Sequence, residues 1–242
     1  MFENQVMKKN DLLFLGLVLL IFLPFFISRP LYEAYTQFNG AHPFVLGFLK
    51  FAILATMGEA LGLRLREGVF NKPGFGLLPR AIVWGFLGVT IVAAFKIFSA
   101  GGPVLLKTIG IQGAAESLSG PMSGLRVLTA FAISFTLNTI YAPVMMTLHK
   151  ITDTHIMNTG GTVPGLLRKI DVGEIMTGLN WRIQWNFIFK KTIPFFWIPA
   201  HTITFLLPVQ FQVLFAAMLG VALGVILAIG VLKSQKPAAR PV

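Results

Sequence analysis

Cysteine is absent from the chain. Disulfide bonds, thiolate metal sites and cysteine nucleophiles are therefore excluded, and cysteine usage gives no indication of the redox compartment. Because the chain also has only four histidines, a covalently attached haem or an iron–sulfur cluster is disfavoured. We expect no cofactor and no bound metal.

Charged side chains are also scarce. They make up 12% of the 242 residues, against 55% hydrophobic residues and a mean hydropathy of +0.75, whereas a soluble domain carries about 25% charged residues. This composition predicts an integral membrane protein whose surroundings are the lipid bilayer. Acidic residues are the scarcer sign, 9 against 20 lysines and arginines. Because the basic residues lie between apolar runs, membrane orientation accounts for them, and no nucleic-acid partner is indicated.

Long apolar segments dominate what the chain does contain. A helix needs about 20 apolar residues to cross the hydrocarbon core, and the ten-residue alternation of an outer-membrane barrel is absent. We therefore predict an all-α integral membrane helical bundle, a single membrane domain over 1–242 with a disordered tail at 233–242. Its six transmembrane helices are expected at 11–28, 43–63, 80–99, 126–149, 184–207 and 209–232.

The last two of these segments follow each other without a polar loop. From Thr192 to Leu232 the chain has no charged residue, and these 41 residues would form a helix of roughly 60 Å, twice the thickness of the bilayer core. We expect a turn at Pro208, since proline removes a backbone donor. Lys190 and Lys191 are expected to extend towards the headgroups.

The distribution of lysine and arginine predicts the orientation. With the N-terminus in the cytoplasm, fifteen of these residues fall on the cytoplasmic side and three on the other, which satisfies the positive-inside rule. An even number of helices places both termini in the cytoplasm. The first segment follows Lys8 and Lys9 without a small-x-small cleavage pattern and is interpreted as an uncleaved anchor. We expect a bacterial cytoplasmic (inner) membrane.

Ionisable residues within the predicted spans are the first functional candidates. Lys50 and Glu59 are nine residues apart on one helix and point to nearly opposite sides, so each needs its own partner or water. For Glu59, a local pairing with Arg64 or Arg66 is one expectation. Lys96 lies near the outer end of its span, where it either faces a polar cavity or extends to the interface.

Polar side chains in the fifth segment form a second candidate group. His201 and Thr204 either bond to neighbouring backbone and helices or line a pore. In the fourth segment, Asn138 and Tyr141 precede Pro143, which favours a kink with the asparagine bonding across a helix interface. His149, Asp153 and His155 have a spacing that suits either a metal site or, more simply, a polar cluster.

Small residues recur every four positions in the sixth segment, which predicts a face for close helix packing. Its members are Ala216, Gly220, Gly224 and Ala228. Enzyme motifs such as H-E-x-x-H, a phosphate loop or G-x-S-x-G are missing, so we expect a protein that is not an enzyme.

The order of features from residue 43 onward resembles a known family, that of the twenty-two-kilodalton peroxisomal membrane protein and its Mpv-type mitochondrial inner-membrane relatives. The second segment ends in Gly58-Glu59 where the family has Gly-Asp, Arg80 opens the next span, and Tyr141-Ala142-Pro143 matches an alanine-proline. The most specific match is a run of aromatic and proline positions in the fifth segment, here Trp197, Pro199, Phe205 and Pro208.

The chain departs from the family at the polar positions of that run, where it has His201, Thr204 and Gln212. The second proline is displaced by one residue, the Trp-Asn of the family's last helix is absent, and the first span is an addition. The resemblance covers about 190 residues and implies a divergent bacterial relative. Because family members are pore-like, it implies passive passage of small solutes.

Three functions follow as hypotheses. The first is a pore or channel for small solutes, with Lys50, Glu59, Lys96, His201 and Thr204 as candidates for a polar cavity. The second is a non-catalytic accessory or scaffold subunit that binds other membrane proteins, or further copies of itself, through its apolar surface. The third, a membrane-embedded enzyme, would need two titratable groups within hydrogen-bond reach in one pocket.

Overall fold

Every regular element of the described chain is helical, which confirms the all-α prediction. The computed structural model describes residues 8–234, with side chains to residue 226. The residue contacts divide the chain into two units, 1–43 and 44–242. The single membrane domain over 1–242 stays a prediction, and the predicted tail lies outside the described residues except for Lys233 and Ser234, which belong to the last helix.

The first unit consists of two helices, α1 (Lys9–Ile27) and α2 (Arg29–Ala41). Ser28 separates them in extended conformation, and its hydroxyl accepts a hydrogen bond from the Leu31 N–H. The missing N–H of Pro30 costs nothing at the start of α2. Phe25 and Tyr35 meet edge to face across the corner.

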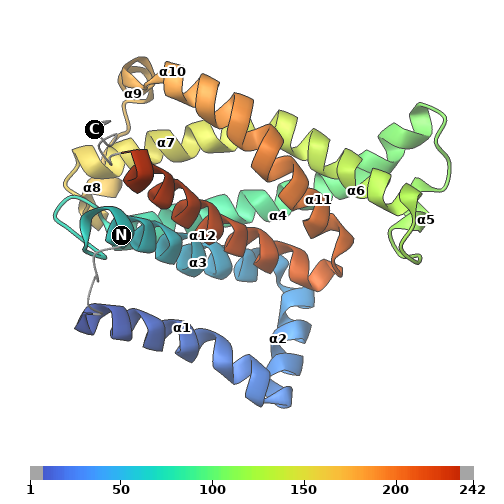
Figure 1. The fold of residues 1–242 in the computed structure, drawn as a ribbon, viewed down its shortest axis with the longest axis horizontal. Helices are drawn as coiled ribbons and strands as arrows, with labels where there is room; N and C mark the ends of the chain where they lie inside the picture. Colours follow the sequence, from blue (N-terminus) through green and yellow to red (C-terminus); the bar gives the residue numbers. More distant parts are fainter. Residues whose placement is uncertain (1–7, 235–242) are drawn as a thin grey trace, which may run out of the picture. The chain divides into compact units, whose positions relative to one another are not determined.

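The second unit begins with two long helices, α3 (Pro43–Glu67) and α4 (Leu77–Thr108). Gly76, at a φ of +72°, forms the left-handed turn from which α4 starts. The short α5 (Ala114–Ser117) turns the chain into α6 (Gly124–Thr136), η1 (Leu137–Tyr141) and α7 (Ala142–Asn158), which together form one continuous helix. Figure 1 shows α6 and the second half of α4 extending together to α5.

The predicted kink before Pro143 is a π-helical turn. In η1 the N–H of Ala142 donates to the carbonyl of Leu137, five residues back. Proline has no N–H to continue the ordinary ladder, and a π-turn widens the helix at such an interruption. The widening is what brings Asn138 to the interface with another helix.

The remaining elements return across the unit. Two short helices, α8 (Val163–Leu166) and α9 (Val172–Gly178), precede a continuous helical segment made of α10 (Trp181–Ile183), η2 (Gln184–Trp197) and α11 (Ile198–Leu206). The chain then turns at Pro208 into α12 (Val209–Ser234), which confirms the predicted turn. The first half of the predicted fifth span differs from the expectation, because η2 is π-helical and contains Pro194.

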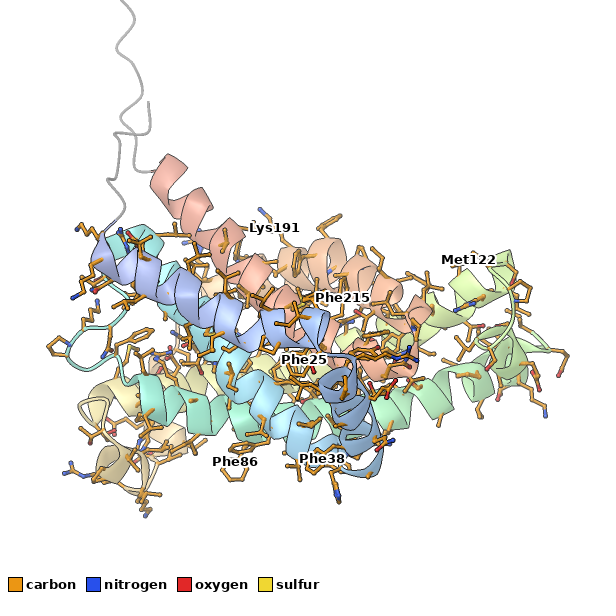
Figure 2. All side chains as sticks on the ribbon, turned by 90° about the horizontal axis from the view of Figure 1, so that it is seen from below. Phe25, Phe38, Phe86, Met122, Lys191 and Phe215 are labelled. Carbon is orange, nitrogen blue, oxygen red and sulfur yellow. The ribbon has the colours of Figure 1, made fainter. Side chains whose placement is uncertain are left out.

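Within the described part of the chain, five helices are long and apolar enough to cross a membrane. They correspond to the first, second, third, fourth and sixth predicted spans, and are Lys9–Ile27, Pro43–Glu67, Leu77–Thr108, Gly124–Asn158 and Val209–Ile226. The fifth predicted span, 184–207, is not among them. Six spans and the cytoplasmic position of the termini therefore stay predictions. Large apolar side chains such as Phe86 of α4 are exposed (Figure 2), as expected of helices that face lipid.

Glycines set the helix spacing in the second unit. A β-carbon on Gly58 of α3 would lie 2.9 Å from the Cα of Val221 on α12, and one on Gly224 would lie 3.3 Å from the carbonyl oxygen of Gly58. Ala216 is buried on the same helix. Two members of the predicted packing face, Ala216 and Gly224, are thus buried or in close contact within the bundle. Gly220 has open space at its β-carbon position and the side chain of Ala228 lies outside the described residues, so the face as a whole stays a prediction.

The contact at Gly58 yields a test of the fold. We expect Gly58→Ala to lower the free energy of unfolding by about 1–3 kcal/mol, because the Val221 backbone must move. Gly101→Ala is the matched control, since Gly101 is exposed on α4 with open space around it and alanine favours a helix by about 0.5–1 kcal/mol. Detergent-solubilised protein would be unfolded thermally or with dodecyl sulfate. Equal stability of the two variants would contradict the close approach of α3 and α12.

Candidate functional site

A cavity of about 620 Å³ lies inside the second unit, between α3, α4, η1, α7, η2, α11 and α12. At one end it is bordered by the exposed side chains of Arg66, Glu67 and Lys150, and this end is called the mouth. At the other end it reaches the buried residues Phe95 and Asn138, and this end is called the inner end. The cavity therefore extends from exposed side chains into the buried interior of the bundle.

Glu59 of α3 is the centre of a polar cluster close to the mouth. One carboxylate oxygen accepts hydrogen bonds from the Trp84 indole at 2.9 Å and pairs with His149 Nε2 at 3.0 Å. The other oxygen pairs with the guanidinium of Arg80. The Trp84 and His149 rings lie 4.4 Å apart, centroid to centroid. Both oxygens are thus occupied by groups from α4 and α7.

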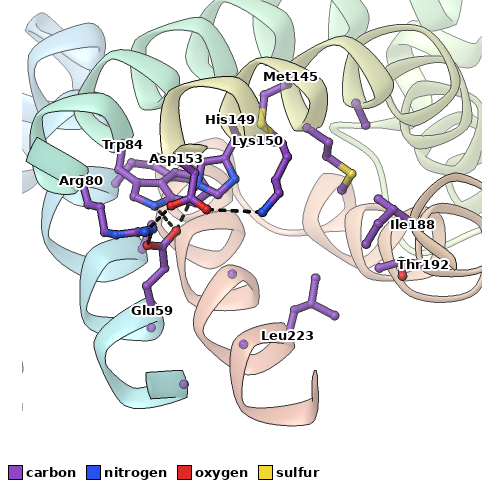
Figure 3. A pocket seen from close by; sticks show the side chains of 18 of the residues that line it. Glu59, Arg80, Trp84, Met145, His149, Lys150, Asp153, Ile188, Thr192 and Leu223 are labelled. Carbon is purple, nitrogen blue, oxygen red and sulfur yellow. Dashed lines mark hydrogen bonds and ion pairs between the residues drawn. The ribbon is translucent and has the colours of Figure 1, made fainter. Parts of the chain in front are cut away.

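Arg80 of α4 connects this carboxylate to a second one. Its Nε donates to the Phe75 carbonyl at 2.7 Å, and its two terminal nitrogens pair with Glu59 and Asp153. The guanidinium also lies over the Phe75 ring at 4.3 Å from the centroid. Only 6% of the Arg80 side chain is exposed. A buried guanidinium is stable when its donors are bonded and its charge is matched. Here Nε bonds to a carbonyl and both terminal nitrogens pair with carboxylates (Figure 3).

Helical spacing explains how four of these side chains converge. Arg80 and Trp84 are four residues apart on α4, and His149 and Asp153 are four residues apart on α7. Residues four apart share one helix face, and α4 packs against α7. The two faces meet at Glu59, so that residues 59, 80, 84, 149 and 153 form one network from three helices.

The expected pairing of Glu59 with Arg64 or Arg66 is wrong. Glu59 bonds across to the next helices, because its helical face points to α4 and α7 rather than along α3. For His149 and Asp153, the polar-cluster interpretation is confirmed, since both belong to the network. His155 is buried and does not border this cavity. Among residues 8–234, no group of three or more metal-ligating side chains is found.

The inner end contains a second, smaller polar contact. Nδ1 of His201 on α11 lies 3.1 Å from Nδ2 and 3.2 Å from Oδ1 of Asn138. Asn138 also donates to the Ser134 carbonyl at 2.8 Å. The edge of Phe95 meets the His201 ring at 5.7 Å. This confirms that Asn138 and His201 bond across a helix interface.

Only part of the predicted polar set is brought together. Glu59 and His201 both border the cavity. Lys50 is buried on α3 and does not border it, and Lys96 is exposed on α4. Thr204 is buried and donates to the Ala200 carbonyl at 3.0 Å, the local bond that threonine in a helix was expected to make.

The site also contains residues that the sequence analysis does not predict as functional. Arg80, Trp84 and Lys150 border the cavity, although Arg80 was noted only as the residue that opens a span. A usable signal was present, because Arg80 and Trp84 repeat the four-residue spacing of His149 and Asp153 in another span. Which carboxylate these faces meet could not be deduced without helix packing.

Comparison with other proteins adds no family to this geometry. No protein-family model matches the chain, and neither the curated proteins nor the solved structures compared with it give a match.

The network predicts a large effect of removing its arginine. We expect Arg80→Leu to lower the free energy of unfolding by about 3–5 kcal/mol, because two carboxylates are left without their cation in a buried site. Lys72→Leu is the control: Lys72 pairs with Glu67 at 2.7 Å, but both side chains are more than 40% exposed, and such pairs contribute at most about 1 kcal/mol. Unfolding in detergent measures both. Similar losses would show that Arg80 is not a structural link.

Proposed function

We propose that the chain is an integral membrane protein of a bacterial cytoplasmic membrane that forms a passive pore for small solutes, without enzymatic activity. The observation that carries this proposal is the cavity itself. Arg66 and Phe51 both border it and are fifteen residues apart on α3, so it extends along about 22 Å of helix. A space of that length, open at one end, is suited to be the vestibule of a pathway.

The described conformation corresponds to a closed pathway. Phe95, Leu137 and the Asn138–His201 pair close the inner end. Asn138 lies in η1, and His201 follows the end of η2 by four residues. π-Helical segments are frequent at functional sites, and a change of winding there would move both residues away from the axis of the cavity. Apolar constrictions of this kind gate many pores.

The family resemblance supports the same proposal, since it implies passive passage of small solutes. Six spans and cytoplasmic termini belong to the proposal as well. The segment 184–207 would supply the missing span, because its helix from Trp181 to Leu206 lies between the other helices of the unit that border the cavity.

A second candidate is the non-catalytic accessory subunit. The observation that favours it is α1, a helix of 19 residues of which none is buried. Such a helix has to be covered by lipid or by another membrane protein. Native mass spectrometry after mild extraction separates the candidates: a fixed ratio to other proteins favours the subunit, and the chain alone or as a homo-oligomer favours the pore.

The closed inner end predicts a variant that conducts more. We expect Phe95→Ala to increase release of small neutral solutes from proteoliposomes several-fold over the wild-type chain, because the apolar barrier at the inner end is removed. Phe86→Ala is the matched control, on the same helix but exposed, and is expected to behave as wild type. If none of the three proteins releases solute above protein-free liposomes, the pore hypothesis is refuted.

A further inference from the structure

We propose that the cavity holds a single-chain amphiphile with an anionic head group, a carboxylate or a phosphate. The head would lie at the mouth against Arg66 and Lys150, and the chain would lie along the apolar wall towards His201. This inference goes beyond permeation, because it concerns a ligand that resides in the cavity and holds whether or not a solute crosses.

The charge balance of the cavity favours an anionic head. Among the described residues, four cationic side chains border it, Arg66, Lys72, Arg80 and Lys150, against the three carboxylates of residues 59, 67 and 153. Arg80 is fully engaged by Glu59, Asp153 and the Phe75 carbonyl. Lys72 makes two hydrogen bonds with Glu67, at 2.7 and 2.8 Å. Arg66 and Lys150 therefore remain to meet a ligand, Lys150 because its ion pair with Asp153 is long, at 3.6 Å.

Both remaining cations are positioned at the mouth. The guanidinium of Arg66 folds back over Gly62, one of its nitrogens lying 3.2 Å from where a β-carbon on that glycine would be. Arg66 has no ion-pair partner among the described residues. Lys150 has one contact, to Asp153 at 3.6 Å, and 47% of its side chain is exposed. Arginine and lysine side chains that border one cavity are suited to bind carboxylate or phosphate oxygens.

Beyond the polar cluster, the wall is suited to a hydrocarbon chain. Met145, Met146, Ile188 and Leu223 border the cavity, and Figure 3 labels three of them, Met145, Ile188 and Leu223, around the ion pairs. Methionine adapts its shape to apolar ligands. A polar mouth followed by an apolar interior matches a molecule with one charged end.

Size distinguishes a single-chain molecule from a two-chain lipid. The volume of about 620 Å³ lies in the range of about 300–1,000 Å³ typical of small-molecule sites. At roughly 30 Å³ for a water-sized group, it accommodates roughly 20 chain atoms. This is enough for one acyl chain and its head, and too little for a diacyl lipid.

The test uses two tryptophans that border the cavity, Trp84 near the mouth and Trp197 near the inner end. Bromine quenches tryptophan fluorescence at contact range. The more exposed Trp181 and Trp185 would be changed to phenylalanine so that they do not contribute to the signal. We expect stearic acid brominated near its carboxyl end to quench Trp84, and stearic acid brominated near its methyl end to quench Trp197. Single-tryptophan chains with Trp84→Phe or Trp197→Phe assign each signal.

Matched variants separate the cavity from the surrounding detergent or lipid. Gly220 borders the cavity and has open space at its β-carbon position, so Gly220→Leu should fill the cavity and abolish quenching of Trp197. Gly101→Leu, on an exposed face, should leave it unchanged. We expect Arg66→Gln to raise the half-quenching concentration at least about tenfold, and Lys72→Gln, whose cation is already paired, by less than about fivefold.

Competition with unlabelled compounds identifies the head group. Laurate and dodecyl phosphate should displace the brominated acid, and the stronger competitor shows whether the site prefers carboxylate or phosphate. Dodecanol, which lacks the charge, should not displace it. The proposal is overturned if dodecanol competes equally, or if Gly220→Leu is quenched like the wild-type chain, because either result means partition into the surrounding apolar phase only.

Discussion

The buried guanidinium of Arg80 is the interaction on which the cavity depends. It joins Glu59 of α3 to Asp153 of α7 while Arg80 itself belongs to α4, so three helices share one charge network. A charge in a low-dielectric interior has to be matched and hydrogen-bonded, and the carbonyl of Phe75 accepts a further hydrogen bond from Arg80. The relative position of these three helices next to the mouth follows from that requirement.

Glycine contacts and proline interruptions shape the rest of the cavity. Gly58 allows α12 to approach α3 closely on one side of the cavity. Methionine and phenylalanine side chains border the cavity on other sides. At the inner end, the π-turn before Pro143 directs Asn138 towards His201 on α11. The cavity is thus long and largely apolar, with a dense charge network at its mouth and the Asn138–His201 contact at its inner end; Tyr141, Gln184 and Thr192 also border it.

This division of polarity connects the two proposals. A pathway for small polar solutes would need polar groups along its length, and the described conformation offers them mainly at its ends. An amphiphile with one charged end matches the same distribution without any change of conformation. A ligand of this kind would occupy the vestibule of the closed pore, and its departure and the opening of the inner end would then be separate events.

The sequence alone determined the class of the protein, because length and hydropathy of a segment are local properties. It predicted an all-helical membrane protein, the turn at Pro208 and the interruption before Pro143, since proline acts on the backbone wherever it stands. It also predicted the small-residue face of α12. The partners of Glu59 were decided only by the tertiary structure, because Arg80, Trp84 and His149 lie 21, 25 and 90 residues away from it. The same holds for the cavity, whose walls come from several helices and whose ends depend on which faces of those helices meet. A polar residue in a span indicates that its side chain needs a hydrogen-bonding partner or the membrane interface, and helix packing determines which of the two it has. This is why the sequence alone did not predict the positions of Lys50, Lys96 and Thr204.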